Sequence, residues 1–224
     1  GGEGEGGKAE SFALKASSIG LPVWRWTSGH KDLNDAAISC TQLPNGGDIL
    51  VVGRYEIGGI TQRSVTKLSQ ATGAKIWTTT DFGDSAGSFG AWETVDITSD
   101  GSAVLLSGWK HKTDTSPMGY RSGGNTFGGQ AVVMKFPVSA MGATAPTSAN
   151  AAWTKVWPNH NAAHAARSLS TGEIAVLLWT DEDPNAPKSL EWGAASVTKL
   201  NADGTNVWGP INQGSAPGKP NQEG

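Results

Sequence analysis

The sequence has little that could support disulfide bonding, membrane insertion or binding to nucleic acid. Cys40 is its single cysteine, so no disulfide can form within the chain and the fold must depend on packing. No run of about 18 apolar residues occurs, which excludes an ordinary transmembrane helix. Its 17 Lys and Arg are balanced by 20 Asp and Glu, and no basic cluster of the kind that binds nucleic acid is present.

Helical patterning is also scarce. No window of 11 residues carries a clear apolar stripe with a period of 3.6, and the 31 glycines would interrupt most helices. Asn-x-Ser/Thr acceptors for N-glycosylation are absent. Ser, Thr, Gly and Trp are nevertheless abundant while Lys and Glu are few, and this composition favours an extracellular or cell-surface protein. The class expected from these features is all-β.

One phrase recurs along the chain with the same order of residue types. It reads SFALKASSIGLPVW at 11–24, SVTKLSQATGAKIW at 64–77 and SVTKLNADGTNVW at 196–208. A degenerate copy, AVVMKF, begins at Ala131 and reaches Trp153 after an insertion. Each copy has an apolar or alternating run, a turn with Gly, and a second run that ends in Trp. This pattern predicts two antiparallel strands joined by a hairpin.

A second hairpin pattern precedes each complete copy. Its turns are marked by Asn45-Gly46, Asp100-Gly101 and Thr171-Gly172. The repeating unit therefore has four strands, which we call A, B, C and D. Four-stranded units of roughly 40 to 50 residues are typical of β-propeller blades. The sequence predicts a β-propeller segment with a half blade at 11–26 and about three full blades at 35–79, 91–157 and 163–209.

Several segments fall outside these units. Residues 110–129 and 137–150 are predicted to be surface loops inserted between strands. Residues 1–10 are expected to be a flexible Gly-rich segment, and residues 210–224 a polar Gly/Pro tail. Because propellers close with about four to eight blades, three and a half cannot close a ring alone. We expect further blades or other copies of the chain to complete it; the alternative is that additional strands lie in segments without a recognisable pattern.

Tryptophan ends each predicted D strand. We expect these rings to pack against the next blade and their N–H groups to find a backbone carbonyl. At the end of the third D strand, Trp157 is an alternative to Trp153. Cys40, near the end of an A strand, is expected to be buried as a small apolar residue. The structural tryptophans predicted in this way are Trp24, Trp77, Trp153 and Trp208.

The run KLSQATGAKIW resembles the tryptophan-docking phrase of the PQQ-like propeller repeats. Gly20, Gly73 and Gly204 each precede a Trp by four positions, as in that phrase. The runs DGSAVLLSGW and GGDILVVGR are also similar to repeats of secreted bacterial and protist propellers. The resemblance covers roughly residues 11 to 208 and implies a β-propeller scaffold, without implying the activity of that family. Quinoprotein dehydrogenases of that family hold a quinone with Ca²⁺, adjacent cysteines and acidic ligands, and this chain has one cysteine and no such segment.

The D–A and B–C loops of a propeller emerge on one face, where binding residues concentrate. We therefore expect a contact face built from these loops. Trp192 lies outside the repeat pattern and is the best candidate for an aromatic sugar-binding platform. No Ser/His/Asp set or carboxylate pair indicates catalysis. The candidate binding residues are His30, His111, Tyr120, Arg121, His160, Asp181, Asp183 and Trp192.

Two patterns raise the question of a metal. His160 and His164 have the spacing of paired ligands on a helix, but the segment is predicted to enter a strand. The run Asp181-Glu182-Asp183, with Asn185, could offer oxygen ligands to Ca²⁺, although a solvated acidic loop is the commoner meaning of such a run. The sequence predicts no resident cofactor, and Ca²⁺ stays an alternative.

These features favour a non-catalytic structural or interaction propeller, part of a larger extracellular or surface assembly that could be filamentous. Its expected partners are further blades or other copies of the chain, with a glycan as an additional candidate. Two alternatives stay open. The chain could belong to a quinoprotein-like enzyme whose active residues lie on other blades, or it could be a carbohydrate-binding propeller that uses the loop at 110–129.

Overall fold

The computed structural model describes residues 2–3, 9–29, 33–84, 89–111, 129–158, 160–180 and 194–212. Within these ranges the protein is all-β: no α-helix is present and every strand pairing is antiparallel. Three sheets have four strands and two have only two. The all-β class predicted from the sequence is therefore confirmed.

The four sheets that matter for function are numbered here in chain order. Sheet 1 pairs β3 (Phe12–Ala16) with β4 (Pro22–Thr27). Sheet 2 contains β5 (Ala36–Gln42), β6 (Ile49–Ile57), β7 (Ile60–Leu68) and β8 (Lys75–Thr79). Sheet 3 contains β9 (Gly90–Ile97), β10 (Ala103–His111), β11 (Gly129–Pro137) and β12 (Trp153–Trp157). Sheet 4 contains β13 (Ala162–Ser168), β14 (Ile174–Thr180), β15 (Ala194–Leu200) and β16 (Asn206–Asn212).

Strands in each four-stranded sheet pair in chain order, so each sheet is an A–B–C–D meander of the kind the repeat predicts. Some boundaries differ from the sequence prediction. The turn between β6 and β7 is tight, since only Gly58 and Gly59 separate the two strands. The last strand, β16, continues past Trp208 to Asn212. At the other end of the chain, β1 (Gly2–Glu3) pairs with β2 (Ala9–Glu10).

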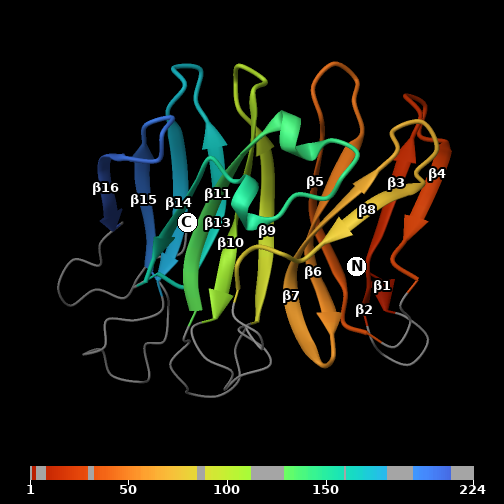
Figure 1. Ribbon diagram of the computed structural model, residues 1–224, viewed down its shortest axis with the longest axis horizontal. Helices are drawn as coiled ribbons and strands as arrows, with labels where there is room; N and C mark the ends of the chain where they lie inside the picture. Colours follow the sequence, from red (N-terminus) through yellow and green to blue (C-terminus); the bar gives the residue numbers. More distant parts are fainter. Residues whose placement is uncertain are drawn as a thin grey trace.

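The sheets follow one another across Figure 1 in chain order, from β3 and β4 at one side to β16 at the other. The first strand of a sheet lies against the preceding sheet: β9 contacts β5, β6 and β7, and β13 contacts β9, β10 and β11. One apolar cluster joins sheets 2 and 3 around Val52, Trp92 and Leu106. A second joins sheets 3 and 4 around Leu105 and Val176. The described sheets do not form a closed ring.

The A–B and C–D turns gather at the upper edge of the row in Figure 1, and the β6–β7 turn lies at the opposite edge. The C–D turns of sheets 1, 2 and 4 have a Gly with positive φ, at Gly20 (82°), Gly73 (71°) and Gly204 (84°). This conformation is costly for residues with a Cβ, which explains why the recurring phrase keeps Gly there.

The insertion at 137–150 is not simply a surface loop, so that prediction was wrong. It forms two short 3₁₀ helices, η1 (Val138–Met141) and η2 (Ser148–Asn150). Met141 is 1% exposed and belongs to the apolar cluster between sheets 2 and 3. An unbranched apolar side chain within a polar-looking stretch anchors the segment onto sheet 2.

Cys40 is exposed, contrary to the sequence prediction. It pairs with Val51, whereas the neighbouring Leu50 and Val52 face sheet 3. Side chains alternate between the two faces of a strand, so Cys40 faces the side of sheet 1. Sheet 1 has no A or B strand among the described residues, and this part of β5 therefore stays uncovered.

Sheets 2 and 3 are also joined by a buried cation. Arg63, at 1% exposure, donates from Nε and Nη2 to the carboxylate of Asp84 at 2.8 and 2.6 Å. Its guanidinium lies 4.3 Å from the centroid of the Trp92 ring. Burial lowers the pKa of Arg63 and the Asp84 carboxylate opposes that shift. Arg63 lies in β7 of sheet 2 and Trp92 lies in β9 of sheet 3. The contact between them therefore holds these two sheets together.

Candidate interaction site

One pair of residue types recurs where neighbouring sheets are joined. A Lys on each C strand stands opposite a Trp on the D strand beside it. Directly opposed residues on one face of an antiparallel ladder have Cβ atoms about 5 Å apart, so the two side chains emerge together. The pairs are Lys15 with Trp24, Lys67 with Trp77, Lys135 with Trp153 and Lys199 with Trp208.

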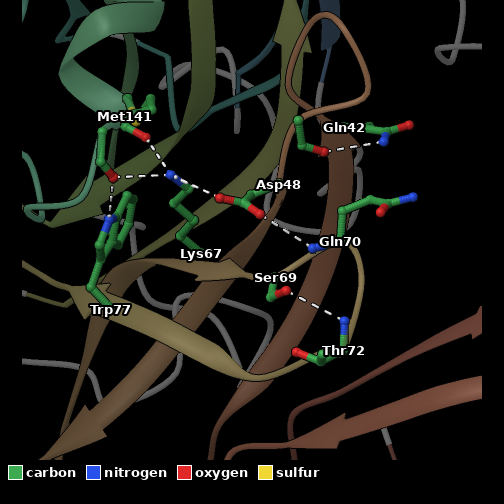
Figure 2. A network of polar contacts seen from close by, with 10 residues as sticks. Gln42, Asp48, Lys67, Ser69, Gln70, Thr72, Trp77 and Met141 are labelled. Atoms are coloured by element: carbon green, nitrogen blue, oxygen red, sulfur yellow. Dashed lines mark hydrogen bonds and ion pairs between the residues drawn. The ribbon is translucent and has the colours of Figure 1, made fainter.

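Figure 2 shows the pair of sheet 2 with its contacts. Trp77 Nε1 donates to the carbonyl of Gly142 at 3.1 Å. Lys67 Nζ donates to the same carbonyl at 3.0 Å and to that of Met141 at 2.9 Å. Both acceptors lie in the C–D connection of sheet 3. The ammonium and the indole therefore converge on one backbone segment of the following sheet, an arrangement that we call the Lys–Trp clamp.

Sheets 1 and 3 each use the same clamp. Lys15 Nζ and Trp24 Nε1 both donate to the carbonyl of Gln70, at 3.0 Å each. Lys135 Nζ and Trp153 Nε1 both donate to the carbonyl of Ala202, at 2.8 and 3.0 Å. In each case the acceptor belongs to the C–D turn of the next sheet. Three clamps therefore connect the four sheets.

Glycine in the accepting turn makes room for the indole. A Cβ on Gly73 would stand 2.6 Å from Cδ2 of Trp24, and one on Gly204 would stand 2.9 Å from Cδ2 of Trp153. Real Cβ atoms do not approach other heavy atoms so closely. The Gly thus serves two purposes, since it adopts the positive φ of the turn and lets the ring lie directly on the backbone.

Carboxylates hold two of the four lysines in place. Lys67 Nζ lies 3.1 Å from Oδ2 of Asp48, whose Oδ1 also accepts from the amide of Gln70. Lys199 Nζ lies 2.7 Å from Oε2 of Glu173. Hydrogen bonds from Lys199 and Thr171 lower the pKa of Glu173. Both acids come from the A–B turn of the same sheet, so the ammonium is positioned before any contact with a neighbouring sheet.

The clamp of sheet 4 has a donor pair without an acceptor. Trp208 is 41% exposed, whereas Trp77 is 8% exposed. No carbonyl among the described residues accepts from Trp208 Nε1, and Lys199 contacts only its own sheet through Glu173. Leu177 and Ile211, on the same face as Trp208, are 40% and 58% exposed. This face corresponds to those that are covered in sheets 2 and 3.

At the other end of the row, sheet 1 has an accepting turn without a donor. The amide of Ser17 bonds to the carbonyl of Leu21, and the amide of Gly20 bonds to that of Ser17. Asn201, Gly204 and Thr205 make the same two bonds in the turn that receives Trp153. By this match Ser18 takes the place of Ala202. Within the described part of the chain no atom lies within 4 Å of a Cβ built on Gly20, so these residues leave the place of the indole open.

Most of the binding residues predicted from the sequence fall outside the described ranges. The backbone of His111 ends β10, opposite Gly129. His160 is half-buried, burial lowers the pKa of its imidazole, and no described residue bonds to its Nε2. The residues outside the described ranges are His30, Tyr120, Arg121, Asp181, Asp183 and Trp192. The predicted contact face therefore stays a prediction.

His160 precedes β13 and His164 lies within it, so the two residues do not share a helical turn. His164 stands in β13 with its ring edge-on to Trp179, at 5.9 Å between centroids. Among the described residues no group of three His, Cys, Asp or Glu is placed to hold a metal ion. The acidic run at 181–183 lies outside these residues.

The tryptophans of the clamp were singled out from the sequence, but their lysine partners were not. The signal was present: a Lys is the fourth or fifth residue of each phrase, at Lys15, Lys67 and Lys199, and the fifth residue of the degenerate copy, at Lys135. A charged residue repeated at one position of an apolar strand indicates a partner, because a cation is rarely covered without one.

Comparison with known proteins adds no family to this description. No protein-family model matches the sequence, and no curated protein matches it significantly. None of the helices in the described part of the chain is long and apolar enough to cross a membrane.

Proposed function

We propose that the protein is a non-catalytic structural module whose sheets stack as propeller-type blades and bind further sheets of the same kind. The unfilled clamp of sheet 4 carries this proposal. Three Lys–Trp pairs find a carbonyl in the following sheet, and the fourth finds none among the described residues, with Lys199 held by Glu173 and Trp208 41% exposed. Repeated use of one interface inside the chain supports its use beyond sheet 4.

The order of contacts supports a blade-like arrangement. In a propeller the A strands lie nearest the axis and neighbour one another. Here β5 contacts β9 and β9 contacts β13, while the clamps bind the C–D sides of the same sheets. The Gly- and Trp-rich composition and low charge are compatible with an extracellular or surface assembly, and stacking without closure is a route to filaments.

The exposed apolar surface of sheet 4 offers a driving force for such binding. Leu177, Trp208 and Ile211 are each at least 40% exposed on one face. Complete burial of a fully exposed large apolar side chain contributes about 1.5–3 kcal/mol, so covering these side chains contributes about half of that each. The two hydrogen bonds of the clamp would add orientation more than affinity, because each exchanges a bond to water for one to a carbonyl.

A chimeric chain tests the proposal. Residues 1–212 are followed directly by a second copy of residues 28–212, so that β16 enters β5 through the same linker that follows β4. Trp208 then stands where Trp24 stands in the natural chain, before the Gln70 turn. We expect Trp208 of the first copy to become protected from solvent. The measurement is ¹⁹F NMR of 5-fluorotryptophan, in which Trp208→Phe in the first copy assigns the resonance and the H₂O/D₂O isotope shift reports its solvent exposure.

A matched control chimera carries Gly73→Asn in the second copy only. Asn tolerates positive φ, so the turn persists, but its side chain occupies the place of the indole. Protection of Trp208 should be lost in this control. A chimera in which Trp208 stays as solvent-exposed as in the 224-residue chain would contradict the proposed function.

A further inference from the structure

We infer that copies of this chain associate head to tail, with Lys199 and Trp208 of one copy clamping the Ser17–Leu21 turn of the next. The inference rests on the proposed function and names its partner. The two halves of one clamp lie at opposite ends of the row of sheets in Figure 1, on β15–β16 and on the β3–β4 turn.

The accepting turn of sheet 1 has the features required of a partner. It repeats the hydrogen bonding of the turn that receives Trp153, with Gly20 at φ 82° where that turn has Gly204 at 84°. The space over Gly20 is empty, while the corresponding spaces over Gly73 and Gly204 are filled by indoles. The carbonyl of Ser18 is the counterpart of Ala202 and has no protein donor among the described residues.

The faces beside these two elements are also complementary. Sheet 1 has an inner face with Lys15 and Trp24, directed to sheet 2, and an outer face with Phe12 and Leu14. Phe12 and Leu14 are 42% and 54% exposed, and Leu21 in the turn is 61% exposed. The outer face of sheet 4 offers Leu177 and Ile211 to them. Contiguous exposed apolar surfaces of this kind mark interaction sites in soluble proteins.

The two surfaces differ, so a single joint between two copies is heterologous; a two-fold arrangement requires both joints at once, which closes a ring of two copies. Each copy that joins leaves one donor pair and one accepting turn unfilled. Association then continues as a linear assembly or ends when a ring closes. Sheet 1 lacks A and B strands among the described residues, so the joint buries less surface than an internal one and is expected to be weaker.

The test uses the full 224-residue chain and two variants that each disable one half of the clamp. Trp208→Ala removes the donor ring and leaves the turn of Gly20 intact. Gly20→Asn keeps the turn, because Asn adopts positive φ, but blocks the indole. Sedimentation velocity over a series of concentrations measures association. The natural chain is expected to form a closed ring of two or more copies or a longer linear assembly, and each variant to weaken association by about tenfold or more, as for an interface anchor.

Two control variants match these changes away from the clamp. Ile57→Ala alters a side chain that is 47% exposed at the opposite edge of sheet 2. Gly172→Asn alters a glycine with φ 85° and no neighbour within 4 Å, in the A–B turn of sheet 4. Both should associate like the natural chain. Far-ultraviolet circular dichroism of all four variants checks that the sheets are retained.

Mixing the two disabled variants gives the decisive result. Each has one intact half of the clamp, so a mixture should form one-to-one dimers and nothing larger. Association unaffected by Gly20→Asn, dimers that the mixture does not restore, or a natural chain that stays monomeric at its highest soluble concentration would each overturn the inference. If the chimera described above nevertheless protects Trp208, the proposed function stands and only the choice of partner is wrong.

Discussion

The guanidinium of Arg63 lies 4.3 Å from the centroid of the Trp92 ring while two of its nitrogens bind the carboxylate of Asp84. This cation is therefore covered by an aromatic face from the next sheet and neutralised by an acid from the connection between the two sheets. Because Arg63 is only 1% exposed, the group cannot regain its water shell if either partner is removed.

We predict that Asp84→Asn lowers the free energy of unfolding by about 3 kcal/mol, because it leaves a buried charge without compensation. Urea denaturation followed by circular dichroism measures the change. Arg167→Ala is the control: Arg167 is 53% exposed and lies 3.6 Å from Asp96, so its loss should cost less than about 1 kcal/mol. Equal losses for the two variants would contradict the role given to burial.

Trp77 and Trp208 occupy equivalent places but should respond differently to substitution. Trp77→Phe removes the N–H that bonds to Gly142 at a buried interface, and we expect a loss of about 1 kcal/mol in unfolding free energy. Trp208→Phe removes an N–H that faces solvent in a single copy, and the expected change is below about 0.5 kcal/mol. The comparison is made by urea denaturation at concentrations where both proteins are monomeric. A larger loss for Trp208→Phe would show that its clamp is filled within the chain.

Gly73 and Gly172 separate backbone strain from steric exclusion. Both have positive φ, at 71° and 85°, so Ala at either position costs about 1–2 kcal/mol. Of these two glycines, only Gly73 has an indole packed against it. Gly73→Ala should therefore lower the free energy of unfolding by about a further 1–3 kcal/mol, as is typical for overpacking. The extra loss should vanish when Trp24→Ala is combined with Gly73→Ala, a double-mutant cycle read by thermal or urea denaturation. Persistence of the extra loss in the double variant would exclude contact with Trp24 as its cause.

Asp100 gives a pH prediction. Its carboxylate accepts hydrogen bonds from Thr98 and from the amide and hydroxyl of Ser102, and these lower its pKa to about 2. The folded pKa lies below the unfolded value of about 3.9, so the stabilising contribution is present above pH about 4 and is lost as the pH falls towards 2. An NMR titration of the carboxyl carbon measures the midpoint directly. Asp100→Asn should reduce the dependence of stability on pH in that window, and a midpoint near 4 would contradict the prediction.

The strand order could be predicted from the sequence because its signals are local. Alternating runs, Gly turns and terminal Trp residues recur within windows of about 14 residues, such as 64–77, and each window contains a complete hairpin. The pairing found between β7 and β8 is the one this window encodes. Whether the sheets close around an axis is not a local property, and the sequence alone does not decide it.

The errors concern contacts between units. Cys40 looks like a core residue within its own strand, but its exposure depends on which strands sheet 1 lacks. Met141 lies in a stretch of small and polar residues, and its carbonyl gains a partner only from the position of Lys67 on sheet 2. The lysine of the clamp was overlooked because a charged residue in a strand is usually read as facing solvent.

All three filled clamps end on main-chain oxygens, those of Gln70, Gly142 and Ala202, and none of them recognises a side chain of the accepting turn. The accepting segments accordingly differ in sequence and in course: SQATGA and NADGT are turns with a positive-φ Gly, whereas MGATAP begins at the end of η1. An interface of this kind tolerates divergence in its partner as long as a main-chain oxygen stays within reach of the Lys and Trp. Units that have lost every recognisable similarity to one another could still be exchanged, duplicated or recombined without redesigning the joint.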